Sequence, residues 1–301
     1  MKFYTSVLPY RGRLLVRGVD KDGTQKKYRI NYKPSLFVPV GKETKYKTLD
    51  GRYVERIKFD SMPEATKWVN EYKNVTNFEY FGNTRHQYPF IADEFKGKID
   101  WDMNKIKLLT IDIECESENG FPSPEKADQP LICITVKDHT TKKIIVFGMG
   151  NFVNDREDVQ YINCVTETGL VETFTKFWVE YNPDIITGWN VKFFDIPYLM
   201  NRFRYLMGDE WLNQFSPWGI VEQKSASVLF ASREQQVWNI MGVDTLDYLD
   251  LYRKFTFVRR ESYKLDYIGE VELGQNKLDN PYDTFKEFYS NDYQRFVEYN
   301  I

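Results

Sequence analysis

The sequence is poor in the residues on which histidine and cysteine chemistry depends. It contains two histidines and three cysteines among 301 residues. The cysteines are odd in number and form no Cys-x-x-Cys pair, which argues against a disulfide framework and a zinc site and fits a reducing cytosol. Carboxylates must therefore carry the chemistry if the chain is an enzyme.

Long apolar segments are also missing. No window approaches the ~20 apolar residues that a membrane-spanning helix needs, and the N-terminus has no apolar signal-peptide core. The sequence thus predicts a cytoplasmic protein without a membrane partner. With 42% hydrophobic and 17% aromatic residues it can still bury large cores, and a length of 301 residues favours two domains over one.

The chain as a whole has no strong excess of either charge, because its net charge is only −3. The distribution is uneven, because residues 1–100 hold 20 Lys and Arg against 12 Asp and Glu, and residues 101–301 hold 21 against 32. A basic first part and an acidic second part suit a phosphate-facing module joined to a carboxylate metal site. Two ordinary surfaces of opposite bias would give the same counts.

Local patterns divide the chain near residue 100. Short apolar runs alternate with turns from Lys2 to Val40, which indicates a small antiparallel sheet. Ser61 and Glu64 have the spacing of a helix start, and apolar residues follow at helical intervals. The polar stretch 96–102 connects the two halves, so we expect one domain at 1–100 and another at 101–301.

The second half alternates strand and helix patterns. The predicted elements are strands at 106–114, 131–136, 144–147 and 184–189, helices at 168–181 and 197–207, and a hairpin at 225–243 that turns around residues 231–234. Strands followed by alternating helices predict an α/β (α+β) domain with a mixed sheet.

Two acids stand at the end of the first strand of this half. Asp112 and Glu114 are two residues apart, so their side chains project from the same face of the strand. Adjacent carboxylates repel each other, and a hard divalent cation with oxygen ligands is their natural partner. A solvated strand edge would show the same pattern.

A third acid follows the strand at 184–189. Asp195 precedes a proline-containing helix start, where Asp is an ordinary N-cap residue. The same position could instead place its carboxylate opposite Asp112 as a metal ligand. The local pattern leaves both readings open.

The end of the chain is expected to be helical. Asp292 can cap a helix that runs through Phe296 and Tyr299 to Ile301, and aromatics at that spacing are usually core residues. This pattern ends without a Gly or another C-cap signal. An interrupted helix of this kind predicts an exposed apolar stripe that includes Phe296 and part of the Tyr299 face.

These segments together resemble the 3′→5′ exonuclease domain of family B DNA polymerases, and within that family the replicative polymerases of T-even-type bacteriophages. The three exonuclease motifs are matched by Thr110-Ile111-Asp112-Ile113-Glu114, by Gly188-Trp189-Asn190 through Asp195, and by Tyr299-Asn300-Ile301 as the start of the third. Further matches are Tyr32-Lys33-Pro34-Ser35-Leu36-Phe37, Gly120-Phe121-Pro122, Asp247-Tyr248-Leu249-Asp250-Leu251-Tyr252 and Leu265-Asp266-Tyr267-Ile268. The resemblance covers essentially the whole chain and includes no polymerase domain.

The sequence departs from the family pattern at two places. The third motif is Tyr, three residues and Asp, so its acid would fall at position 303, beyond Ile301. Lys264 stands where the family usually has Ser or Thr before Leu265. One of four acidic ligands is therefore absent from this chain, and the primer contact at Lys264 is altered.

The resemblance implies an RNase H-like domain that hydrolyses the terminal phosphodiester with two Mg²⁺ or Mn²⁺ ions. Asp112, Glu114 and Asp195 would hold the ions, and Tyr299 would orient the attacking water. Phe121 would stack on a base of the frayed end. Asn190 and Lys264 are the other implied DNA contacts, and the 225–243 hairpin would help to separate primer from template.

The implied role is the proofreading part of a replicative polymerase. Its partners would be single-stranded or frayed primer-template DNA and a C-terminal polymerase portion, either from the same gene or from a separate chain. A sliding clamp would bind only through that other portion. The protein would be phage-encoded and act in the host cytoplasm. A catalytically incomplete module for nucleic-acid binding or assembly is the alternative, and a free-standing exonuclease is a third reading.

Overall fold

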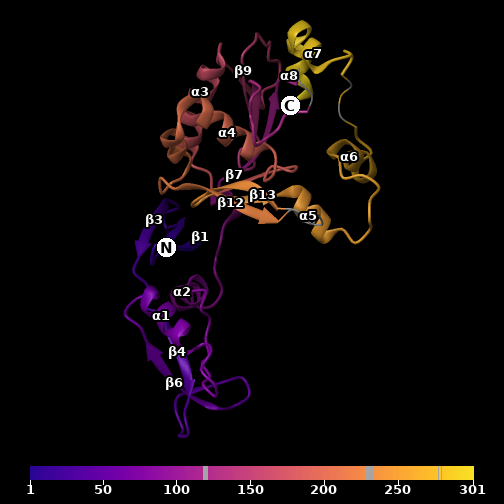
Figure 1. Ribbon diagram of the computed structural model, residues 1–301. Helices are drawn as coiled ribbons and strands as arrows, with labels where there is room; N and C mark the ends of the chain where they lie inside the picture. The colour runs from indigo at the N-terminus through magenta and orange to yellow at the C-terminus, as the bar shows by residue number, and fades with distance from the viewer. Residues whose placement is uncertain (118–120, 228–233, 277, 279) are drawn as a thin grey trace. The chain divides into compact units, whose positions relative to one another are not determined.

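The computed structural model describes residues 1–117, 121–227, 234–276, 278 and 280–301. The chain forms two compact units, Met1–Lys105 and Ile106–Ile301 (Figure 1). Within the described residues, no helix is both long and apolar enough to cross a membrane.

The first unit contains two small antiparallel sheets in place of the single one expected. Its elements are β1 (Phe3–Tyr10), β2 (Arg13–Val19) and β3 (Gln25–Ile30) in one sheet, β4 (Ser35–Pro39), β6 (Tyr53–Lys58) and β5 (Tyr46–Lys47) in the other, the helices α1 (Met62–Tyr72) and α2 (Gln87–Glu94), and the 3₁₀ turn η1 (Met103–Lys105). The predicted helix start is confirmed, because the Ser61 hydroxyl accepts from the Glu64 N–H at 3.3 Å.

The second unit is built on a six-stranded mixed sheet. Its strands are β7 (Leu108–Cys115), β8 (Leu131–Asp138), β9 (Ile144–Gly148), β10 (Val159–Asn163), β11 (Ile185–Gly188) and β14 (Asp244–Asp247), in the order β10-β9-β8-β7-β11-β14. The central strand β7 is antiparallel to β8 and parallel to β11. The predicted mixed α/β class is confirmed, while β10 and β14 were not predicted.

Helices and a hairpin complete this unit. They are α3 (Glu167–Tyr181), α4 (Asp195–Met207), the 3₁₀ helix η2 (Asp209–Phe215), the strands β12 (Val221–Ser227) and β13 (Glu234–Ile240), and the helices α5 (Tyr248–Phe255), α6 (Leu265–Leu273), α7 (Phe285–Asn291) and α8 (Tyr293–Tyr299). The strands β12 and β13 pair antiparallel, as the hairpin prediction requires. Residues 231–233 of the predicted turn lie outside the described part of the chain.

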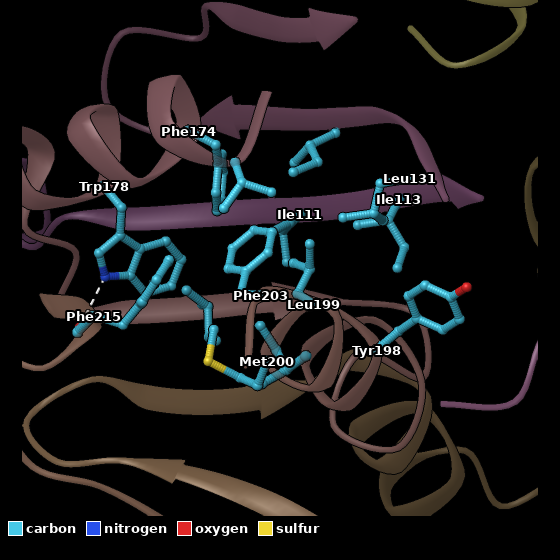
Figure 2. Close-up of a cluster of buried hydrophobic side chains, with 14 of the residues drawn as sticks. Ile111, Ile113, Leu131, Phe174, Trp178, Tyr198, Leu199, Met200, Phe203 and Phe215 are labelled. Carbon is cyan, nitrogen blue, oxygen red and sulfur yellow. Dashed lines mark hydrogen bonds between the residues drawn. The ribbon is translucent and has the colours of Figure 1, made fainter. Parts of the chain in front are cut away.

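The main core lies between the sheet and the helices α3 and α4. Alternate residues of β7 point into it, which Figure 2 shows for Ile111 and Ile113 among the aromatic side chains of α3 and α4. The Trp178 indole is buried there and donates its N–H to the Phe215 carbonyl at 2.9 Å. Because this hydrogen bond pairs the indole N–H, the large Trp178 side chain can be buried without leaving an unpaired donor.

A second core covers the opposite face of the sheet. Buried residues of α7 and α8 pack on β8, β9 and β10, and the cluster includes Cys133, Val146, Phe288 and Phe296. The helix α8 and the strand β9 lie side by side in Figure 1. Phe296 is fully buried. The expected exposed stripe at Phe296 was therefore wrong, because the cluster on this face encloses the residue.

Two glycines allow α8 to dock. The Tyr293 hydroxyl accepts from the Met149 N–H at 2.9 Å and lies 3.1 Å from the Tyr161 hydroxyl. A Cβ at Gly148 would lie 2.3 Å from that Tyr293 oxygen, and one at Gly150 would lie 2.6 Å from the ring. The tyrosine thus occupies space that only glycine leaves, and this contact fixes α8 on the sheet.

Substitution of Gly150 by Ala is expected to lower the free energy of unfolding by about 1–3 kcal/mol, the usual cost of overpacking. The Tyr293 ring has little room to retreat, since its hydroxyl is held at Met149. Chemical denaturation measures the loss. Gly41→Ala is the matched control, because a Cβ at Gly41 would meet no atom within 4 Å. Equal stability of the two variants would contradict this docking contact.

Candidate metal and nucleic-acid site

The acids Asp112 and Glu114 lie on one face of β7, as their spacing predicts. They pair in register with Thr135 and Cys133 of β8. Cys133 belongs to the core beneath α7 and α8, so both acids stand on the face of the sheet that these helices cover. Asp112 is exposed and Glu114 is half-buried.

Asp195 is the first residue of α4 and is buried. The N-cap of α4 is Phe194, and no side-chain hydrogen bond caps the helix there. Burial, and then the negative charge of Asp112, hold the pKa of the Asp195 carboxyl well above its ordinary value, with a smaller rise from Glu114. The capping reading of Asp195 is therefore wrong. The acids of β7 lie close enough for their charges to raise the pKa of its carboxyl.

The chemistry of this acidic set fits a divalent cation. Oxygen ligands with surplus negative charge are what Mg²⁺ and Mn²⁺ prefer. A cation beside a buried carboxyl would also offset the burial and repulsion that raise its pKa. Over the described residues, no group of three or more His, Cys, Asp or Glu side chains is arranged closely enough to hold a metal ion. Ligation by Asp112, Glu114 and Asp195 thus stays a prediction.

The substitution Asp195→Asn is expected to stabilise the metal-free chain at neutral pH. With its pKa raised by folding, Asp195 takes up a proton in the folded state at a pH where the unfolded chain does not. The contribution of Asp195 to the free energy of unfolding therefore rises as the pH falls from its pKa in the folded chain to its lower pKa in the unfolded chain. The total rise is about 1.4 kcal/mol for each unit by which the two pKa values differ.

Urea denaturation in EDTA at several pH values tests this expectation. The difference between the unchanged chain and Asp195→Asn isolates this carboxyl from other titrating groups. Asp155→Asn, at an exposed position, serves as the control. The expectation fails if Asp195→Asn is less stable than the unchanged chain at neutral pH. It also fails if the stabilities of the two chains change with pH at the same slope.

Asp247, at the end of β14, positions the loop that leads to Asp195. Its buried carboxylate accepts from the N–H of Asn190 at 3.1 Å and of Lys192 at 3.0 Å. It also caps α5 through the Leu249 N–H at 2.9 Å. Burial raises the pKa of Asp247, and these backbone donors oppose the rise. One carboxylate thus joins α5 to the loop that carries the second motif.

Three predicted DNA contacts have definite places. Asn190 lies in the turn after β11 with a left-handed φ of 64°, which Asn tolerates well. The Phe121 side chain is 86% exposed, and its ring centroid lies 5.3 Å from that of Phe194, the residue before Asp195. Lys264 is exposed and occupies the N-cap of α6 without a side-chain cap hydrogen bond. Gly120 lies outside the described residues.

Tyr299 lies at the end of α8 on the face of the sheet that carries Asp112. Its ring is partly buried and meets Phe288 edge-on with centroids 5.6 Å apart. The predicted start of this helix is confirmed, because the Asp292 carboxylate accepts from the Arg295 N–H at 3.1 Å. These contacts show core packing for Tyr299, and its placement beside the acids stays a prediction.

Sequence reasoning missed the residues that hold the site together. Asp247 belongs to a segment that matches the family, and an acid directly before a helix pattern is a signal for the cap that it forms on α5. No local signal identifies its bonds to Asn190 and Lys192, which lie far away in the sequence. The docking of Tyr293 on Gly148 and Gly150 was equally invisible.

Comparison with known proteins gives a family match and two relatives that align with the whole of this chain. Residues 64–268 match the family described as DNA polymerase family B, exonuclease domain. The DNA-directed DNA polymerases of Escherichia phage RB69 and Enterobacteria phage T4 are 31% and 28% identical over the whole of this chain. The DNA polymerase delta catalytic subunit of Candida albicans is 31% identical over 59% of this chain and 18% of its own length. The chain spans 36% of the length of each phage relative.

Proposed function

The chain belongs to family B of the DNA polymerases, of which it carries the exonuclease domain, and we propose that it is the proofreading 3′→5′ exonuclease part of a replicative polymerase. Its substrate is the 3′ end of single-stranded or frayed primer-template DNA, and its reaction is hydrolysis of the terminal phosphodiester. In this proposal residues 1–100 form the N-terminal domain and residues 101–301 belong to the exonuclease domain.

The observation that carries this proposal is the buried carboxyl of Asp195 beside Asp112. A raised carboxyl pKa caused by burial and a neighbouring acid is typical of functional sites. The strand order supports an RNase H-like classification, since β8 runs antiparallel to β7 and β9, while β7, β11 and β14 run parallel.

In this proposal the side chains of Asp112, Glu114 and Asp195 would hold two Mg²⁺ or Mn²⁺ ions. Such ions would supply an activated water and would neutralise charge on the attacking and leaving oxygens. The Tyr299 hydroxyl would hydrogen-bond the attacking water and orient it. The Asp expected at the fourth position after Tyr299 would complete the acidic set from the following part of the polymerase.

The exposed Phe121 ring stacks on a base of the melted 3′ end. Base–aromatic stacking contributes about 1–3 kcal/mol per base and tolerates any sequence. The β12–β13 hairpin helps to keep the primer end apart from the template, and the Gln235 side chain ties it to the Phe193 carbonyl at 2.8 Å. Asn190 and Lys264 are the further proposed DNA contacts.

The C-terminal portion of the polymerase is the proposed protein partner, on the same gene or on a separate chain. The length of the phage relatives supports this, because about two thirds of each lies outside the alignment. A sliding clamp would be reached through that portion. The proposed setting is a phage-encoded protein in the host cytoplasm.

Hydrolysis of a 5′-labelled single-stranded oligonucleotide tests the proposal. The 301-residue chain is compared with a chain extended through the Asp at the fourth position after Tyr299, each with Mg²⁺ or Mn²⁺. Residues four apart on a helix share a face, so the added acid would lie one turn beyond Tyr299. The extended chain is expected to shorten the oligonucleotide from its 3′ end, and the shorter chain to do so very slowly or not at all.

A second candidate is a nucleic-acid-binding or assembly module without its own hydrolytic activity. It is favoured by the lack, within the described residues, of a three-ligand metal group. The same assay separates the two functions. An extended chain that binds the oligonucleotide but never shortens it would support the module and exclude the exonuclease.

A further inference from the structure

A patch of exposed aromatic and basic residues lies where α5 ends and the chain continues towards α6. We define the α5–α6 patch as Lys254, Phe255, Phe257 and Arg259. The Phe257 side chain is 98% exposed and Phe255 is 66% exposed. Two exposed phenylalanines that lie two residues apart are costly to hydrate, which marks the patch as a contact surface.

The charge of the patch is opposite to that of its surroundings. Residues 253–264 hold five Lys and Arg and one Glu, whereas residues 101–301 as a whole have an acidic excess. Within the described part of the chain, neither Lys254 nor Arg259 makes an ion pair. The Lys254 ammonium lies 5.6 Å from the Phe255 ring centroid. These cations thus face solvent beside the aromatic rings.

Residues next to the patch are held by contacts with α5 and α6. Arg260 pairs with Glu272 of α6 and donates to the Tyr252 hydroxyl at 3.1 Å. The guanidinium carbon of Arg253 lies over the Tyr263 ring, 4.5 Å from the ring centroid. These contacts tie the chain on both sides of Phe257 to α5 and α6.

The patch is also tied to the second exonuclease motif. The Trp189 indole N–H donates to the Tyr263 carbonyl at 3.0 Å, and its ring packs on Tyr252 with centroids 5.8 Å apart. Asp247 caps α5 and holds the Asn190 and Lys192 N–H groups. The segment with the patch is thus joined by hydrogen bonds to the loop that ends at Asp195.

The composition favours nucleic acid over protein as the occupant. The cores of protein interfaces are depleted of charged residues, whereas this patch carries the cations Lys254 and Arg259 beside its two rings. A surface that binds a single strand combines Lys and Arg for the phosphates with aromatic rings on which unpaired bases stack. The exposed cations Lys254 and Arg259 complement the negative charge of the phosphates.

We propose that the α5–α6 patch binds the single-stranded stretch of DNA next to the exonuclease site, with Phe257 and Phe255 stacking on bases and Lys254 and Arg259 contacting phosphates. This inference rests on the proposed function and extends it to a second place on the strand. Phe121 serves the terminal base, and the α5–α6 patch serves nucleotides farther from the 3′ end.

Fluorescence anisotropy of a labelled oligothymidine in EDTA tests the proposal, because no hydrolysis can occur there. Phe257→Ala is expected to weaken binding about 5- to 100-fold, and Phe257→Trp to restore it. Arg259→Gln should reduce the slope of log affinity against log salt by about 0.7. Tyr205→Ala, which removes a 76% exposed aromatic from α4, should change neither quantity.

Unchanged affinity in Phe257→Ala, or failure of Phe257→Trp to restore binding, would overturn the proposal. A change in sedimentation without a change in DNA affinity would do so too, since it would identify a protein interface. The test is independent of the metal site. Loss of binding in Phe257→Ala together with normal hydrolysis in Asp112→Ala would uphold the patch and reject the proposed catalytic residues.

Discussion

Replacement of Asp112 by Ala in the extended chain is expected to lower 3′→5′ hydrolysis by about 10³-fold or more, equivalent to about 4 kcal/mol of transition-state stabilisation. The residue is an exposed acid beside the buried Asp195, and its proposed role is metal ligation. Its removal buries no new surface and relieves repulsion on Asp195. We therefore expect the melting temperature in EDTA to stay the same or rise.

The measurement combines a labelled single-stranded oligonucleotide with thermal unfolding of the same preparations. Asp155→Ala removes an exposed acid outside the site and should keep full activity. Tyr299→Phe should cost less activity than Asp112→Ala, because it removes water orientation and keeps the acids. An undiminished rate in Asp112→Ala would place the chemistry on other residues.

The largest stability effect is expected at the ion pair between Arg202 of α4 and Glu167 of α3. The two side chains are only 6% and 15% exposed, and two N–H groups of Arg202 meet the two carboxylate oxygens at 2.7 Å each. Glu167 also accepts from the Leu131 N–H at 2.7 Å. Arg202→Met should cost about 3–5 kcal/mol, because it leaves Glu167 buried without its cation.

Denaturant unfolding of single and double variants tests this pair. In Arg202→Met with Glu167→Gln, the amide oxygen of Gln can still accept from Leu131, so part of the stability should return. The exposed pair Arg156–Asp158 is the matched control, and Arg156→Met should cost less than about 1 kcal/mol. Equal losses at both arginines would contradict the importance of burial at Arg202.

This pair matters for the site because it fixes α4, which begins at Asp195. Arg202 also donates to the Ala127 carbonyl at 3.2 Å, next to the chain that enters β8. The helix is thus held against the strand that neighbours Asp112. We expect Arg202→Met in the extended chain to reduce hydrolysis through displacement of Asp195.

Much of the fold could be predicted from the sequence because its signals are local. A period of two residues places Asp112 and Glu114 on one face of β7, whatever the strand packs against. The spacing of Ser61 and Glu64 predicts the start of α1, and apolar residues at helical intervals predict α3. The motifs that carried the family resemblance are also short and local.

The strands β10 and β14 escaped prediction because their patterns are weak alone. Both lie at edges of the sheet, where pairing with β9 and β11 supplies the hydrogen bonds that define them. A strand of four or five residues with half-exposed side chains has no clear apolar alternation. Its existence depends on a neighbour elsewhere in the sequence.

Only the tertiary structure decided what the key side chains do. Asp195 has the local pattern of a helix cap, yet the packing of α4 buries it beside Asp112. Phe296 was expected at the surface, yet the strands β8 to β10 enclose it with Phe288. Asp247 holds a loop that lies 55 residues away in the sequence. Charge repulsion, burial and hydrogen bonds act through space, so residues that are distant in the sequence set the pKa, the exposure and the role of each site residue.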